Sequence, residues 1–388
     1  MNDLTIDVID SLTGIDATQW NRLAGGDPLL SHAFLSALHE TGCASSRTGW
    51  TPQFIVLRRN GALAGALPLY LKPHSWGEYV FDWAWADAYH RHGLDYYPKL
   101  VAAVPFTPVA GARLLAPTPQ LKVLLVRAAL RLAQELEVSS LHVLLPDADD
   151  AAVLSDEGLL IRHGVQFHWH NPGYKSFDDY LAGMNHDKRK KIRQERRKVK
   201  DAGITFERIE GDAIRDEHWR FFFRCYSDTY RQHGSSPYLS LRFFRRLGTI
   251  LSGQVLLIVA SRAGVPIAAA LNIRAPQRLC GRYWGTLEYH PALHFETCYY
   301  QAIEYCITQR IATFEGGAQG EHKIARGLLP VETRSAHWLA HPEFSAAIEQ
   351  YLARETIGMS GYMDELNERS PFKAAGIAGC AEPVGKSD

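Results

Sequence analysis

The sequence predicts an α/β protein with mixed sheets, built from two tandem copies of one α/β unit. The chain of 388 residues is longer than an ordinary domain with one hydrophobic core, so two domains are expected. Hydrophobic residues make up 46% of the chain and charged residues 22%, as in folded globular proteins. A hairpin pattern occurs twice, at 54–71 and 257–274, with Arg59 and Gly61 repeated as Arg262 and Gly264. The alternative is that the two α/β units are unrelated and look alike by coincidence, because both are built from the same kinds of short strands, turns and helices.

The first copy is expected to begin with a strand at 4–9 and helices at 17–23 and 33–40, the second of them capped by Ser31. Asn60-Gly61 is a pair that adopts positive φ, so strands 53–59 and 62–71 should form a hairpin. An insert at 72–118 precedes an amphipathic helix at 120–137 and a strand at 140–145. We assign residues 1–170 to this N-terminal domain.

The second copy follows Asn171-Pro172-Gly173, which interrupts regular structure and marks the domain boundary. It is expected to contain a basic helix at 186–200, the second hairpin, a helix at 295–310 and a strand at 312–315. Residues 171–373 form this C-terminal domain, and 374–388 are predicted to be a flexible tail.

The composition argues against export, membrane insertion and a metal centre. Residues 1–10 lack the basic and apolar regions of a signal peptide, and prolines interrupt the most apolar stretch, 100–116. The six cysteines form no C-x-x-C pair, and no H-E-x-x-H motif occurs. We therefore expect a reduced, cytoplasmic protein without a metal and without a membrane span.

The helix at 186–200 carries nine Lys or Arg residues against Asp187 and Glu195. Like charges at helical spacing repel unless anions offset them. We predict that Arg189, Lys190 and Arg193 bind phosphates of a donor substrate. The alternative is a solvated basic surface helix.

A second candidate site is the segment FEGGAQGEHKIARGLLP at 314–330, which follows an apolar strand end, where α/β proteins place ligands. Its two adjacent glycines permit close backbone approach. The predicted donor-binding residues here are Gly316, Gly317, Gln319, Lys323 and Arg326. The candidate proton-transfer residues are Glu315, Glu321 and His322, together with His294. The alternative is a glycine-rich turn with an ordinary helix cap.

The insert at 72–118 begins with a stretch unusually rich in aromatic residues interleaved with polar ones. Such a composition suits a ligand wall or, equally, an aromatic seam between the two copies. The candidate substrate-binding residues are Lys72, Trp76, Asp82, Trp85, Asp87 and Tyr97 from this insert and Arg282, Trp284 and Glu288 from 282–301.

Several long strings resemble the FemAB-like "peptidoglycan biosynthesis/recognition" family of the GNAT superfamily. They include KRKKIRQERRKV, GRYWGTLE, LHFETCYYQAIE and EGGAQGEHKIARGLLP, and the resemblance runs from residue 31 to about 372. One departure is Cys280, where the family usually has an aromatic residue. The resemblance implies two tandem GNAT-like domains of the Fem aminoacyltransferase type. Positions that match Fem motifs are Lys190, Arg193, Arg196 and Gly203 in the basic helix region, and Lys323, Arg326 and Gly327.

Fem relatives add amino acids from aminoacyl-tRNA to a peptidoglycan precursor, so the resemblance implies an acyl- or aminoacyltransferase acting on an amine of a peptide or small molecule. We expect no tightly bound cofactor, with aminoacyl-tRNA or acyl-CoA as co-substrate. The segment 282–301 offers only Gly285 where GNAT enzymes use a glycine-rich pyrophosphate loop, which weakens the case for coenzyme A. The alternative function is a non-catalytic module that recognises cell-wall or nucleotide-sugar ligands.

Overall fold

The computed structural model describes residues 4–318 and 320–373. Its contacts divide the chain into two compact units. Unit 1 comprises Met1–Val165, Tyr238–Arg246 and Glu332–Tyr362, and unit 2 comprises Gln166–Pro237, Leu247–Val331 and Met363–Asp388. The expected tail at 374–388 and the candidate Gln319 lie outside the described residues.

Unit 1 contains two sheets, with strand orders β1-β3-β4 and β2-β5-β6-β7-β14-β8. Its strands are β1 (Leu4–Ile9), β2 (Thr51–Pro52), β3 (Phe54–Arg59), β4 (Ala62–Leu67), β5 (Tyr70–Lys72), β6 (Lys99–Ala102), β7 (Ser140–Leu144) and parts of β8 (Leu160–His170) and β14 (Leu329–Leu339). Its helices are α1 (Ala17–Leu23), α2 (His32–Glu40), α3 (Trp83–Arg91), α4 (Pro119–Glu135), α5 (Ala148–Asp156) and most of α12 (Pro342–Glu368).

The core of unit 1 forms where α4 packs on β3, β4 and β7. Thr118 caps α4 by accepting a hydrogen bond from the Leu121 amide, and Pro119 occupies the first turn, where no amide donor is needed. The buried face of the helix repeats at helical spacing through Leu125, Ala129 and Ala133. The predicted hairpin is confirmed, because Asn60 and Gly61 both have positive φ.

Unit 2 is built on a sheet that continues from β14 and β8 in the order β13-β12-β11-β10-β9. Its remaining elements are α6 (Phe177–Ala182), α7 (His186–Asp201), β9 (Ile204–Glu210), α8 (Asp216–Gln232), β10 (Val255–Arg262), β11 (Val265–Ala275), β12 (Arg278–Thr286), α10 (Leu293–Phe295), α11 (Gln301–Gln309) and β13 (Thr313–Glu315). The helix α9 (Leu241–Ile250) has residues in both units. A π-helical turn at Glu296–Tyr300 joins α10 to α11, and a 3-10 turn, η5, spans Glu321–Arg326.

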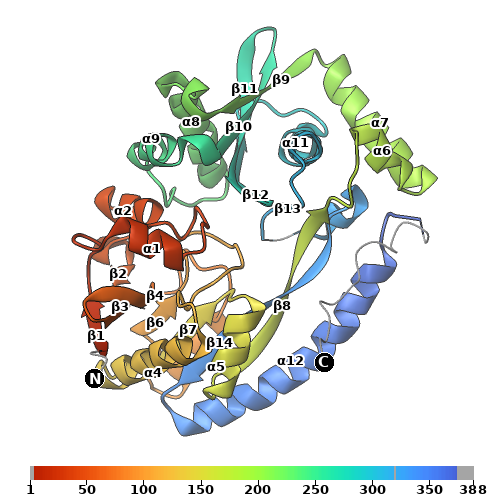
Figure 1. The fold of residues 1–388 in the computed structure, drawn as a ribbon. Coiled ribbons are helices and arrows are strands. Elements are labelled where there is room, and N and C mark those ends of the chain that lie inside the picture. The colour runs from red at the N-terminus through yellow and green to blue at the C-terminus, as the bar shows by residue number, and fades with distance from the viewer. Residues whose placement is uncertain (1–3, 319, 374–388) are drawn as a thin grey trace, which may run out of the picture. The chain divides into compact units, whose positions relative to one another are not determined.

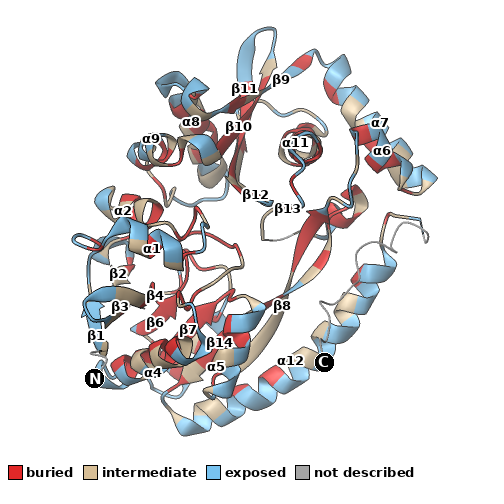
Figure 2. Cartoon of the chain, in the orientation of Figure 1, coloured by how far each residue is buried: buried red, intermediate tan, exposed pale blue. Residues whose placement is uncertain are grey.

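The sheet of unit 2 is buried between helices, with α8 against one face and α11 on the other (Figure 1). The strands β10 and β11 are largely buried (Figure 2) and read as nearly continuous apolar runs, as expected of strands covered on both faces. The second hairpin repeats the turn of the first, because Ala263 and Gly264 also have positive φ. No helix among the residues 4–318 and 320–373 combines the length and the apolar composition that a bilayer crossing requires.

Candidate active site at the end of β13

The candidate site of unit 2 opens where two parallel strands separate. β12 and β13 pair from Arg278–Thr313 to Cys280–Glu315, after which β13 ends and β12 continues to Thr286, paired only with β11 on its other side. A cavity of about 150 Å³ lies at this point. Its walls are Ala270, Leu271, Asn272, Gly281, Arg282, Tyr283, Trp284, His294, Cys298, Tyr299, Phe314, Gly316 and Gly317.

Glycines are required where the strands separate. A Cβ at Gly316 would lie 2.5 Å from Leu328 Cδ2, closer than real Cβ atoms approach. Gly317 has a φ of +88°, which a residue with a side chain rarely adopts. The predicted Gly316-Gly317 pair therefore lines the cavity because its backbone needs both close packing and positive φ.

Lys323 stands behind this glycine pair. It lies on η5, is only 2% exposed, and its ammonium donates a hydrogen bond of 2.7 Å to the Gly317 carbonyl. Within the described part of the chain no carboxylate forms an ion pair with it, and burial lowers its pKa to about 8. Lys323 thus brings a poorly compensated positive charge to the rim of the cavity.

Two histidines accompany this lysine. His294 lines the cavity, and burial together with the neighbouring His322 lowers its pKa to about 4. The Nε2 atom of His322 lies 3.1 Å from the Tyr299 hydroxyl, and burial and Arg326 lower the pKa of this histidine as well. Both rings are therefore neutral at pH 7 and able to accept a proton.

Arg326 does not face the cavity, in contrast to its predicted role in donor binding. Its guanidinium bonds to Glu195 of α7 at 2.7 Å and to the His322 carbonyl at 2.7 Å, and it stacks 3.3 Å above the Phe295 ring. The Tyr300 hydroxyl donates a second hydrogen bond to Glu195. Through Glu195, these contacts hold η5 against the basic helix α7.

The two glutamates proposed for proton transfer are also placed in ion pairs outside the cavity wall. Glu315 bonds to Arg278 at 3.1 Å, and Glu321 bonds to Arg369 of the segment after α12 at 2.6 Å. Glu288, a candidate substrate ligand, pairs with Arg262 at 2.8 Å on the exposed hairpin, whereas Arg282 and Trp284 do line the cavity. Of the four catalytic candidates, the structure thus gathers His294 and His322 next to Lys323.

The basic helix α7 forms as predicted, with Asn185 as its cap and Ile192 and Val199 as its buried seam. His186, Arg189, Lys190, Arg193, Gln194 and Arg197 surround a shallow hollow of about 390 Å³. Arg193 makes an exposed ion pair with Asp178 at 3.4 Å. A larger groove of about 660 Å³ runs between α7, β9 and the π-helical turn, next to Arg197 and Lys200.

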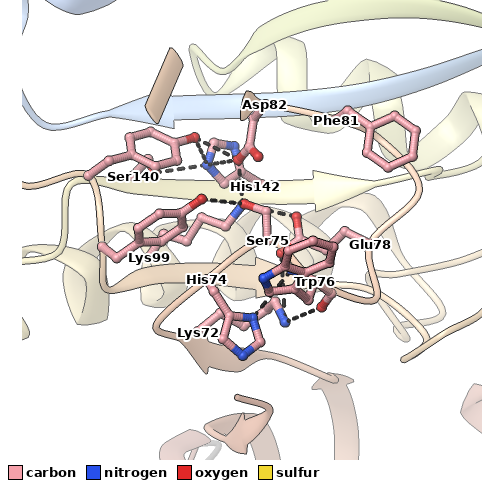
Figure 3. Close-up of polar contacts among 12 residues, drawn as sticks. Lys72, His74, Ser75, Trp76, Glu78, Phe81, Asp82, Lys99, Ser140 and His142 are labelled. Carbon is pink, nitrogen blue, oxygen red and sulfur yellow. Dashed lines mark hydrogen bonds and ion pairs between the residues drawn. The ribbon is translucent and has the colours of Figure 1, made fainter. Parts of the chain in front are cut away.

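In unit 1 the residues of the aromatic insert form a closed polar cluster (Figure 3). Lys99 donates to Ser75 at 2.7 Å and to Glu78 at 2.9 Å, and it also pairs with Asp82. The predicted ligand Lys72 donates to the Gly49 and Trp76 carbonyls and lies 3.6 Å from the centre of the Trp50 ring. Burial lowers the pKa of Lys72 to about 7, although Glu78 raises it.

This cluster continues through Asp82, which accepts a 2.7 Å hydrogen bond from Tyr96. Tyr96 touches His142 at 3.0 Å, and the Nδ1 atoms of His142 and His337 lie 2.7 Å apart. Lys72 and Asp82 are therefore buried among internal partners instead of forming an open wall, although Asp82 Oδ1 has no hydrogen-bond partner among the described residues.

The other aromatic-insert candidates have separate positions. Trp85 is buried against His337, with ring centroids 4.8 Å apart, and the Tyr97 hydroxyl lies 3.0 Å from Ser75. Trp76 is exposed and lies 5.2 Å from the Trp83 ring, and Asp87 makes a surface pair with Arg91. Of these candidates, Trp76 is the aromatic side chain exposed to solvent, next to the exposed Trp83.

Comparison with known proteins decides the family. The model of the FemAB-like family, described as peptidoglycan biosynthesis/recognition, matches residues 11–374. The chain belongs to this family. No curated protein matches it.

Two solved structures resemble this FemAB-like protein over most of its length. FemX is 12% identical with a TM-score of 0.54, covering 86% of this chain and 98% of FemX. L-PGS from Bacillus licheniformis is 11% identical with a TM-score of 0.55, covering 86% of this chain and 94% of L-PGS. The predicted α/β fold with mixed sheets is confirmed.

The sequence analysis missed three residues of these sites. Asn272 is the lone polar residue in the buried run AAALNI, a signal that was present in the sequence. Lys99 pairs with Ser75, Glu78 and Asp82 of its own insert, but the sequence does not show how the insert folds. Glu195 carried no such signal, because Arg326 lies 131 residues away in the chain.

Proposed function

We propose that this FemAB-like protein transfers an acyl or aminoacyl group to an amine at the cavity between β12 and β13. The observation that carries the proposal is Lys323, a buried ammonium without a carboxylate partner among the described residues, bonded to Gly317 at the cavity rim. Such a charge is suited to an oxygen that becomes negative during acyl transfer. The family membership and the likeness to FemX and L-PGS support this proposal.

In the proposed reaction the acceptor nitrogen forms a bond to the acyl carbon, and the bond from that carbon to the oxygen or sulfur of the carrier breaks. Lys323 and the backbone amides at Gly316-Gly317 stabilise the oxyanion. The neutral ring of His294 accepts the proton that the amine loses and returns it to the departing atom. His322 is the second candidate for this proton.

The donor is carried by aminoacyl-tRNA or acyl-CoA, and the acceptor is an amine of a peptide or small molecule, with peptidoglycan-related compounds first among them. Six cations of α7 have more than a third of their surface exposed, and only Arg193 of these makes an ion pair within the described chain. They would hold carrier phosphates. Binding should therefore weaken steeply with added salt.

The test of the proposal is removal of the Lys323 charge. Lys323→Met should lower kcat by about 100-fold or more, because loss of one oxyanion donor costs roughly that much. Transfer is measured with aminoacyl-tRNA and acyl-CoA donors to peptide amines. Lys175→Met, at an exposed lysine of unit 2, is the matched control and should leave kcat unchanged. Wild-type protein without turnover on any donor, or equal rates for both variants, would refute the proposal.

A second candidate function is a binding module without chemistry. It is favoured by the closed ion pairs of the unit 1 cluster and by the exposed Trp76–Trp83 pair, which could stack on a sugar ring. Quenching of tryptophan fluorescence by muropeptides, lost in Trp76→Ala, together with no transfer by the wild-type protein, would favour this reading.

A further inference from the structure

Asn272 is directed into the cavity by an irregularity of the sheet. In the pairing of β11 with β12, Leu271 lies opposite Tyr283 but Asn272 lies opposite Gly281, so Arg282 is the extra residue of a β-bulge. Bulges change the direction of side chains and are frequent next to active sites. Leu271, Asn272 and Gly281 all line the cavity as a result.

The side-chain amide of Asn272 is unsatisfied where it stands. Asn272 is 1% exposed, and its Nδ2 atom has no hydrogen-bond partner within residues 4–318 and 320–373. Gly281 keeps the space in front of it open, since a Cβ there would lie 3.5 Å from Asn272 Oδ1 and 3.3 Å from the Glu315 carbonyl. Buried amides are normally paired, so an unpaired donor facing a cavity points to a ligand oxygen.

The charges around the cavity restrict that ligand further. Arg282 lines the cavity and Lys323 stands behind Gly317, whereas none of the described lining residues is an aspartate or glutamate. The nearest glutamate along the chain, Glu315, is bonded to Arg278. Among the described residues that line the cavity, a ligand ammonium would meet the cation Arg282 and no carboxylate, with Lys323 behind Gly317, which disfavours its burial.

The volume sets the size of the ligand. A volume of about 150 Å³ is enough for a molecule such as benzene, so the cavity suits a small transferred group of roughly six non-hydrogen atoms. The rings of Tyr283, Trp284 and Phe314 provide apolar walls for such a group.

We propose that Asn272 donates a hydrogen bond to an oxygen of the transferred group, and that the cavity selects small acyl groups that are neutral or anionic over α-aminoacyl groups. This assignment rests on the proposed transferase function and specifies its donor. Asn272 is a specificity-determining residue in this scheme, and Lys323 retains its role at the oxyanion. The bond formed and the bond broken are those given above for the transfer step.

The experiment compares two acyl groups of equal shape on each carrier. Lactyl and alanyl groups differ only by a hydroxyl in place of the α-ammonium, so lactyl-tRNA is compared with alanyl-tRNA and lactyl-CoA with alanyl-CoA. The wild-type protein should have a kcat/KM at least about 10-fold higher for the lactyl donor on the carrier that it uses. Asn272→Asp, which has the same shape and adds a negative charge, should reverse this preference.

Two further variants guard against trivial outcomes. Asn272→Leu removes the donor without adding charge and should lower both kcat/KM for the lactyl group and the lactyl-to-alanyl ratio, without reversing the preference. Asn367→Asp, at an exposed position of α12, should match wild-type protein on all four donors. Thermal unfolding of every variant reports whether it folds.

The outcomes separate the two proposals. An active wild-type protein that prefers alanyl donors, or a lactyl-to-alanyl ratio that Asn272→Asp leaves unchanged, overturns the assignment of Asn272 while the transferase stands. No transfer from any of the four donors by wild-type protein overturns the transferase itself, and with it the assignment.

Discussion

At the scale of single residues, burial gives Lys323 its chemical character. Its ammonium is held by one backbone carbonyl and stands near the neutral rings of His294 and His322. Burial without a carboxylate lowers its pKa to about 8, so the charge that the proposed reaction needs is lost within the range of pH at which enzymes are assayed.

A pH profile tests this residue. Protonated Lys323 decreases as pH rises through about 8, so kcat should fall above that pH even though more of the acceptor amine becomes deprotonated. In Lys323→Arg the charge persists, because guanidinium remains protonated to above pH 12. The variant should keep a flat or rising profile up to pH 10, whatever its absolute rate. Parallel declines in both proteins would assign the alkaline limb to another group.

The sequence identified part of this site for a physical reason. Gly316-Gly317, Lys323 and His322 lie within one short loop, so their proximity follows from chain connectivity. Asn272 reaches the same cavity from another strand through a bulge, and neither the strand pairing nor the bulge can be read from local periodicity. The ion pairs of Arg326 with Glu195 and of Glu321 with Arg369 could not be foreseen, because these partners are distant in sequence.

At the scale of elements, α7 has two different faces. Its exposed cations face solvent, whereas Glu195 on its inner side holds Arg326 of η5 and the Tyr300 hydroxyl of the π-helical turn. π-Helical turns occur frequently at functional sites. The one carboxylate in the middle of the basic helix thus positions the loop that carries Lys323.

Glu195→Gln tests this connection. Loss of the carboxylate leaves Arg326, which is largely buried, without its anionic partner, so the free energy of unfolding should fall by roughly 2–4 kcal/mol. Asp178→Asn breaks the exposed pair with Arg193 on the same helix and should cost less than about 1 kcal/mol. Urea unfolding measures both. Equal losses for the two variants would contradict a positioning role for Glu195.

Most elements could be predicted from the sequence where caps and periodicity agree. The helices expected at 17–23 and 120–137 lie at Ala17–Leu23 and Pro119–Glu135, and Ser31 caps α2 as predicted. The helix expected at 295–310 is instead interrupted by the π-helical turn, which local propensity does not encode. Pro342 occupies the first turn of α12, where its missing amide costs nothing.

At the scale of the whole molecule, both units bury neutral histidines. His142 and His337 lie in the polar cluster of unit 1, and His168 lies on β8 in unit 2. Burial lowers the pKa of His142 and of His168 to about 3 in each case, from the usual value of 6.5. The unfolded chain therefore binds more protons than the folded protein between about pH 3 and pH 6.5.

Stability should consequently fall as the pH is lowered through this window. One such histidine removes about 2 kcal/mol at pH 5 relative to neutral pH, since each pH unit corresponds to about 1.4 kcal/mol. His142→Gln should lose part of this pH dependence, even though it is less stable at pH 7. His90→Gln, at an exposed site, is the control. Chemical denaturation from pH 4 to pH 8 measures the slopes, and identical slopes for all three proteins would exclude the buried pair as the cause.

The division of the chain is the feature that sequence patterns predict least well. The expected boundary at 170/171 follows a local Asn-Pro-Gly signal, and the structural division after Val165 lies close to it. The return of Tyr238–Arg246 and Glu332–Tyr362 to unit 1 depends on contacts between residues far apart in the chain. Local composition contains no information about such contacts.

This arrangement has a consequence for the order in which the protein is made. In the sheet of unit 1, β14 lies between β7 and β8 and pairs with β7 from Ser335–Leu144 to Leu339–Ser140. A ribosome therefore completes nearly all of unit 2 before the central strand of unit 1 has been synthesised. Until then the edge of β7 that pairs with β14 stays unpaired in the nascent chain. Unpaired strand edges promote aggregation, so we expect a chaperone to be needed most at this stage of biosynthesis.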